Sequence, residues 1–126
     1  MTATKSILTI SRNKVLQDTR TIILQRAGYQ VSAAHSDDEA TRFVEENPYN
    51  LVLLCHSVPE SSRIFLAKKL KELQPKMPIL MLYNGYDPTE ALVDGSLHSL
   101  ESPIALLNMI GFLTMNTSFS SVPEAY

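Results

Sequence analysis

The chain has 126 residues, the usual length of one folded domain, and its 44% hydrophobic and 19% charged residues are ordinary for a globular protein. Its 11 basic and 13 acidic residues give a formal net charge of -2, so no basic surface or long apolar run predicts binding to nucleic acid or to a membrane. A single cysteine excludes an internal disulfide and a cysteine-based zinc site, and we expect a cytoplasmic protein.

The first half of the chain alternates between short apolar runs and helical patterns. Apolar runs near the N-terminus and around residue 31 predict two strands. Between them, Val15, Leu16 and Ile22 recur at helical spacing and predict an amphipathic helix with Gly28 at its end. A second helix follows, and acidic residues in its first turn favour the helix dipole.

The second half continues the same alternation. The unbroken apolar run of residues 51–54 predicts a strand buried on both faces, as in a parallel sheet that is covered by helices. Ser61 and Ser62 are expected to cap the next helix, and residues 79–82 predict a fourth strand. A short helix, an edge strand and a last helix that opens at Ser102 complete the pattern.

Five alternations of strand and helix, with no repeat and no linker, predict one α/β domain over residues 1–115 with a mainly parallel sheet. Residues 116–126 have no periodicity and are expected to be disordered. Right-handed crossovers then give a doubly wound open sheet, whose ligand-binding edge lies at the carboxyl ends of its strands. Cys55 directly follows the central apolar run at that edge, so we expect a functional site around it.

The segment around Cys55 resembles the phosphorylation segment of bacterial response-regulator receiver domains (CheY-like). In that family the third strand ends in an Asp that accepts a phosphoryl group, and a Pro follows a few residues later. Here the same pattern runs from Asn50 through the apolar run to Cys55 and then to Pro59. The resemblance covers roughly residues 5–114 and implies a flavodoxin-like, three-layer α/β/α fold with a five-stranded parallel sheet of order 2-1-3-4-5.

The positions that carry the receiver chemistry all differ from the family pattern. The family has two acidic Mg²⁺ ligands, the phosphoacceptor Asp, a small hydroxyl residue, a Lys before a Pro, and a switch aromatic on strand five. The corresponding residues here are Ser11 and Arg12, Cys55, Tyr83, Ser102, and Ser99 at the switch position. The resemblance therefore implies a degenerate receiver, or pseudo-receiver, with a vestigial phosphorylation pocket, no metal, no cofactor and no enzymatic activity.

Two of these side chains, Arg12 and Cys55, have two interpretations, and Tyr83 has one. Arg12 either binds an anion or lies solvated on the rim of the pocket. Cys55 is either a reactive thiol, with a pKa lowered by Arg12, or a small inert residue at the end of a buried strand. Tyr83 is expected to plug the emptied pocket, with its ring packed and its hydroxyl near water.

The function that the resemblance implies is signalling in a two-component (phosphorelay) setting, by phosphorylation-independent binding to a partner protein such as a kinase or an output protein. Receivers use the face of helix four, strand five and helix five for dimerisation and output. This face corresponds here to residues 87–113, so a homodimer through it is also expected. Two alternatives stay open: a thiol-based redox sensor or enzyme that uses Cys55, and a binder of a small anion at Arg12 and the loop amides.

Overall fold

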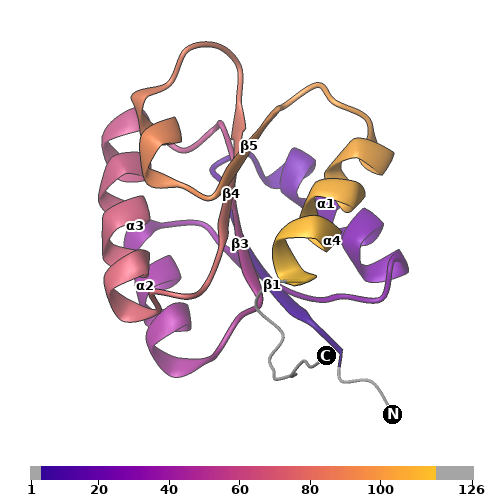
Figure 1. Cartoon of the computed structure of the whole chain (residues 1–126), viewed down its shortest axis with the longest axis horizontal. Coiled ribbons are helices and arrows are strands. Elements are labelled where there is room, and N and C mark those ends of the chain that lie inside the picture. Colours follow the sequence, from indigo (N-terminus) through magenta and orange to yellow (C-terminus); the bar gives the residue numbers. More distant parts are fainter. Residues whose placement is uncertain (1–3, 116–126) are drawn as a thin grey trace, which may run out of the picture.

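A five-stranded parallel sheet forms the centre of the computed structural model, which describes residues 4–115 (Figure 1). The sheet has the order β2-β1-β3-β4-β5, so the predicted fold class and strand order are confirmed. The predicted disorder of residues 116–126 lies outside the described residues. The strands are β1 (Ser6–Ile10), β2 (Gln30–Ala34), β3 (Leu51–Leu54), β4 (Ile79–Tyr83) and β5 (Gly95–His98).

Helices cover both faces of the sheet and make three layers (Figure 1). α1 (Lys14–Arg26) and α4 (Pro103–Met115) pack on one face, and α2 (Asp37–Glu46) and α3 (Glu60–Leu73) pack on the other. A 3-10 helix, η1 (Pro88–Leu92), connects β4 to β5 and contacts α3. Within residues 4–115, no helix has both the length and the apolar character to cross a membrane.

The central strand β3 is buried on both faces, as its unbroken apolar run predicts. Leu51 and Leu53 belong to the core beneath α1 and α4, whereas Val52 and Leu54 belong to the core beneath α2 and α3. Successive side chains of a strand point to opposite faces, so this one run supplies both cores and fixes β3 in the middle of the sheet.

The predicted end of α1 at Gly28 is confirmed, whereas the predicted start of α3 is not. The Asn13 side chain accepts a hydrogen bond from the Leu16 amide at 3.1 Å, and Gly28 has a φ of +99° just after the helix ends. The expected capping of α3 by Ser61 and Ser62 is wrong. α3 begins at Glu60, directly after Pro59, so both serines already lie within its first turn.

The side of α1 that faces the sheet also differs from the expected one. Val15 is 74% exposed and Ile22 is 51% exposed, whereas Gln17 and Leu24 are buried. The Gln17 side-chain nitrogen donates to the Thr9 main-chain oxygen at 3.2 Å and to its hydroxyl at 3.0 Å. It also lies 3.3 Å from the main-chain oxygen of β2's last residue. These bonds orient α1, so a polar side chain faces the sheet and part of the apolar stripe faces solvent.

Candidate functional site

The carboxyl ends of β1 and β3 meet at the edge where the sequence predicts the site. The Cys55 amide donates to the Ile10 main-chain oxygen at 3.0 Å, which sets Cys55 beside Ser11. Ser102 does not join this group, because it is exposed and its hydroxyl accepts a hydrogen bond from the Ala105 amide at 3.2 Å. Ser102 therefore caps α4, as predicted, and places no charge in the pocket.

Ser57, which the sequence analysis did not single out, organises the loop after β1. Its hydroxyl accepts hydrogen bonds from the amides of Arg12 at 2.9 Å and Asn13 at 3.2 Å. It also lies 3.0 Å from the Ser11 hydroxyl, which in turn accepts from the Asn13 amide at 3.0 Å. The protein's own hydroxyl groups thus already satisfy these loop amides.

Arg12 lies on the rim and forms an ion pair. Its Nη2 is 2.8 Å from Asp37 Oδ1, at the start of α2. Both Arg12 and the loop amides thus have partners within the protein, so the hypothesis of an anion site there gains no support and stays a prediction. The expected influence of Arg12 on the Cys55 pKa is wrong: the arginine that acts on Cys55 is Arg20, on α1.

Cys55 is a buried, protonated thiol. It is 1% exposed and belongs to the core beneath α1 and α4. Burial raises the pKa of Cys55 to about 11, although the positive charge of Arg20 and side-chain contacts with Arg20 and Ser11 oppose the rise. The thiolate is the nucleophilic form of cysteine, so this environment favours the inert interpretation of Cys55.

Arg20 and His56 lie next to this thiol and are not part of the predicted pocket. The Nη1 atom of Arg20 is buried and has no hydrogen-bond partner among residues 4–115. Burial lowers the pKa of His56, and the nearby charges of Arg20, Arg63 and His98 lower it further. The positive charge that acts on Cys55 is that of Arg20, whereas the lowered pKa of His56 favours its neutral form.

Arg63, at the start of α3, ties together the loops that follow β3 and β4. Its Nη2 lies 2.6 Å from Asp87 Oδ2, and its Nη1 donates to the main-chain oxygens of His56, at 3.3 Å, and Val58. Asp87 also accepts from the Thr89 amide at 2.9 Å. Burial alone would raise the pKa of Asp87, but these hydrogen bonds and the charge of Arg63 lower it below its ordinary value.

Tyr83 borders a small cavity beside this ion pair. Its ring packs edge-on against the His98 ring, with centroids 5.5 Å apart. The cavity has a volume of about 150 Å³, and Tyr83, His56 and Arg63 contribute to its walls. At the switch position, the Ser99 amide donates to the Tyr83 main-chain oxygen at 2.8 Å, and its hydroxyl contacts Asn84.

The residues around Cys55 do not fit a magnesium site. Magnesium prefers carboxylate and water oxygens, whereas the side-chain groups that act on Cys55 are the Ser11 hydroxyl and the Arg20 guanidinium. Asp37, the carboxylate that contacts the loop after β1, is paired with Arg12. Among residues 4–115, no group of three or more His, Cys, Asp or Glu side chains could hold a metal ion.

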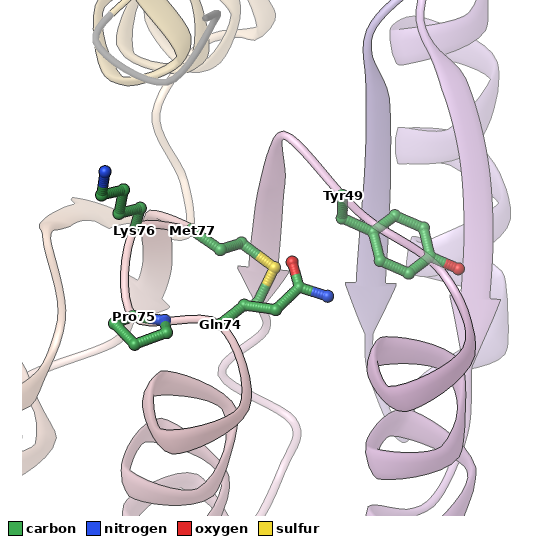
Figure 2. Close-up of a pocket in the computed structure, with 5 residues that line it drawn as sticks. All are labelled: Tyr49, Gln74, Pro75, Lys76 and Met77. Atoms are coloured by element: carbon green, nitrogen blue, oxygen red, sulfur yellow. The ribbon is translucent and has the colours of Figure 1, made fainter.

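A larger hollow lies at the opposite edge of the sheet, before β3 and β4. Its volume is about 370 Å³, and Figure 2 shows the Gln74 and Met77 side chains directed toward Tyr49 and the Lys76 side chain directed away. The side-chain nitrogen of Gln74, Nε2, donates to the main-chain oxygens of Val44, at 2.9 Å, and Asn47, at 3.0 Å. This hollow has a structural hydrogen bond at its wall and no convergent reactive groups, so we place the candidate site at the carboxyl edge.

The solved structures that resemble this chain include response-regulator receiver proteins. A CheY-like receiver domain protein from Methanospirillum hungatei JF-1 superposes with a TM-score of 0.82 and 23% identity, over 91% of this chain and 98% of that chain. The chemotaxis protein CheY4 of Vibrio cholerae gives a TM-score of 0.79 and 21% identity, over 88% of this chain and 99% of that chain. The chain therefore has the receiver (CheY-like) variant of the flavodoxin-like fold.

Two curated sequences are also similar to this chain, and the similarity covers only a small part of each of these longer proteins. The transcriptional regulatory protein ZraR of Escherichia coli O157:H7 is 32% identical over 106 residues, which make up 82% of this chain and 24% of ZraR. ZraR of strain K12 is 32% identical over 90 residues, or 69% of this chain and 20% of that protein. The chain thus spans about a quarter of the length of these relatives. No protein-family model matches it.

Proposed function

We propose that this chain is a degenerate response-regulator receiver domain that acts in two-component signalling by binding a partner protein, without phosphorylation and without catalysis. The observation that carries the proposal is the apolar character of the solvent-facing side of α4. Ile104 is 70% exposed and Phe112 is 63% exposed, and no residue of α4 is charged. A surface helix of a protein that acts alone normally presents polar and charged residues to solvent.

The exposed apolar residues concentrate on one layer of the molecule. Of the nine large hydrophobic side chains that are exposed among residues 4–115, three lie on α1 and three on α4. These two helices cover the same face of the sheet. Together with β5 and η1, α4 forms the face that receivers use for dimerisation and output, which supports a kinase, an output protein or a second copy of this chain as partner.

The pocket supports the absence of phosphorylation, and a mass measurement tests it. The protein should gain no phosphoryl group from acetyl phosphate with Mg²⁺, because burial raises the pKa of Cys55 and because Ser11 and Arg12 follow β1 where the family has its two acidic metal ligands. Intact-mass spectrometry after incubation with the phosphodonor measures the outcome. A gain of one phosphoryl group that disappears in Cys55→Ala would contradict the proposal.

The α4 face predicts self-association that a single charge abolishes. Sedimentation velocity of the wild-type chain should show a dimer, and Phe112→Glu should be monomeric, because the substitution places a charge in an apolar contact. Phe65→Glu, on α3 in the opposite layer, is the matched control and should leave the dimer intact. A wild-type chain that stays monomeric at high concentration would refute the homodimer.

The thiol-based alternative has less support than partner binding. A redox cysteine is usually accessible and has a lowered pKa, whereas Cys55 is buried and its pKa is raised to about 11. Slow modification of the native thiol near neutral pH is what this environment predicts.

A further inference from the structure

The loop after β4 contains an Asn-Gly pair that is open to solvent. Asn84 and Gly85 directly follow the last residue of β4, and both are exposed. Asn84 is the only asparagine of the chain that is followed by a glycine. A glycine has no Cβ, so nothing hinders the approach of its main-chain nitrogen to the side chain of the preceding residue. The loop therefore places a potential nucleophile next to an accessible side-chain amide.

Ser99, directly after β5, contacts this side-chain amide. The Ser99 main-chain amide donates to the Tyr83 main-chain oxygen at 2.8 Å, which sets Ser99 beside the start of the loop after β4. The Ser99 hydroxyl donates a hydrogen bond to Asn84 Oδ1. A donor on a carbonyl oxygen stabilises the negative charge that develops there when a nucleophile attacks the carbonyl carbon. Ser99 is therefore positioned to activate Asn84 Cγ.

A second pair with the same backbone chemistry, Asp94 and Gly95, is held in place by its contacts. Asp94 Oδ2 lies 2.6 Å from Lys71 Nζ and accepts a hydrogen bond from the Ile79 amide at 2.7 Å. Gly95 begins β5 and pairs with Leu80 of β4. The carboxylate is thus engaged and the glycine backbone is fixed in the sheet. The pair after β4 has neither restraint, and its carbonyl oxygen accepts a donor.

We propose that Asn84 is a site of spontaneous deamidation that the Ser99 hydroxyl assists. The Gly85 main-chain nitrogen attacks Asn84 Cγ with its lone pair, loses its proton to solvent and closes a succinimide ring. The bond between Cγ and Nδ2 breaks, and the nitrogen takes up a proton and leaves as ammonia. Water then adds to either carbonyl of the ring and opens it to aspartate or isoaspartate. The reaction needs only water, so it is independent of the proposed partner binding.

The product adds a negative charge to the cavity beside His56. Asn84 and Arg63 both line this cavity of about 150 Å³. Arg63 Nε is buried and has no hydrogen-bond partner among residues 4–115. A carboxylate at position 84 is attracted to this guanidinium, whereas the amide carries no charge. The charge at this edge of the sheet should therefore change with the age of the molecule.

Incubation of the purified protein in mildly alkaline buffer tests the site, with peptide mass mapping at intervals as the readout. Digestion in acid keeps further conversion from occurring during the mapping. We expect the peptide with Asn84 to yield succinimide, aspartate and isoaspartate, whereas the peptides with Asn13 and Asn50 keep their mass and Asp94 forms no isoaspartate. Conversion of Asn84 no faster than that of Asn13, or a product without isoaspartate, would overturn the proposal.

Two variants separate the attacking nitrogen from the Ser99 hydroxyl. Gly85→Ala should slow the conversion about tenfold, because a Cβ hinders the attack. This variant should fold normally, since a Cβ at Gly85 would meet no atom within 4 Å. Ser99→Ala removes the donor and should slow the conversion about threefold, less than the loss of a donor in a buried oxyanion hole.

The matched control is Ser96→Ala, on β5. The Ser96 hydroxyl is bonded to Glu90 at 3.0 Å and not to Asn84, so this substitution should leave the rate unchanged. A Ser99→Ala protein that converts as fast as the wild type, or a Ser96→Ala protein that slows equally, would remove Ser99 from the reaction. A Gly85→Ala protein that converts at the wild-type rate would exclude the succinimide route.

Discussion

Arg63→Met is expected to lower the free energy of unfolding by about 3 kcal/mol, because it breaks a buried ion pair from one side. The Arg63 side chain is 12% exposed and the Asp87 side chain is 7% exposed. The substitution also removes the donor to the main-chain oxygens of His56 and Val58. The loss of stability is large because the substitution leaves a buried carboxylate without its counter-charge. It also leaves two carbonyl groups without their donor.

Urea unfolding measures this loss, with Lys68→Met on the exposed side of the same helix as the control. The control should change the free energy of unfolding by less than about 0.5 kcal/mol. The effect should also depend on pH, because the pKa of Asp87 in the folded state lies below its ordinary value of 3.8. The ion pair stabilises the protein fully at pH values above this ordinary pKa, and the stabilisation is lost as the pH falls through the lowered pKa of Asp87 in the folded state. The free energies of unfolding of the wild-type protein and of Arg63→Met should therefore converge in acid. A difference that grows in acid would contradict this account.

Cys55→Asp, which restores the acidic residue of the receiver pattern, should be tolerated only while Arg20 is present. The charge of Arg20 already acts on the residue at position 55, so it can compensate a carboxylate there. Arg12 cannot do this from its pair with Asp37. In the double variant Cys55→Asp/Arg20→Met, the carboxylate is buried without a counter-charge. We therefore expect the free energy of unfolding to fall by about 3 kcal/mol more than the sum of the losses in the two single variants.

Unfolding of the wild-type protein, both single variants and the double variant gives the coupling energy. Cys55→Asp combined with Arg12→Met is the control and should be additive. A coupling energy near zero with Arg20 would mean that its guanidinium does not reach position 55. Calorimetry with beryllofluoride, a phosphoryl mimic, and Mg²⁺ should show no binding to Cys55→Asp, because the other groups of the receiver site are still missing and act as a unit. Tight binding would mean that carboxylates elsewhere hold the metal.

The sheet could be predicted from the sequence because its signals are local. The run from Leu51 to Leu54 is apolar without interruption, and only a strand buried on both faces needs such a run. The end of α1 at Gly28 and the start of α4 after Ser102 were predicted from capping preferences that act within a few residues. The start of α3 was not, because the residue before the helix is Pro59, which makes no side-chain capping hydrogen bond.

The groups that now define the site could not be predicted, because their roles depend on tertiary contacts. The orientation of α1 follows from the hydrogen bonds of Gln17 to β1 and β2, and periodicity alone placed the other side against the core. Arg20 therefore had no expected role, and neither did Arg63, whose partners Val58 and Asp87 lie in two different loops. The one signal in the sequence was the presence of an arginine within each of these two helices, Arg20 in α1 and Arg63 in α3.

The ion pair of Arg63 and Asp87 has a consequence for how this protein could carry information. A conformational switch needs two arrangements of its loops that differ little in free energy. A link that costs about 3 kcal/mol to break holds any arrangement without it below about 1% of the molecules. Under the proposed function, a partner would therefore meet a single arrangement of these loops, and its binding would not depend on a rearrangement at this edge.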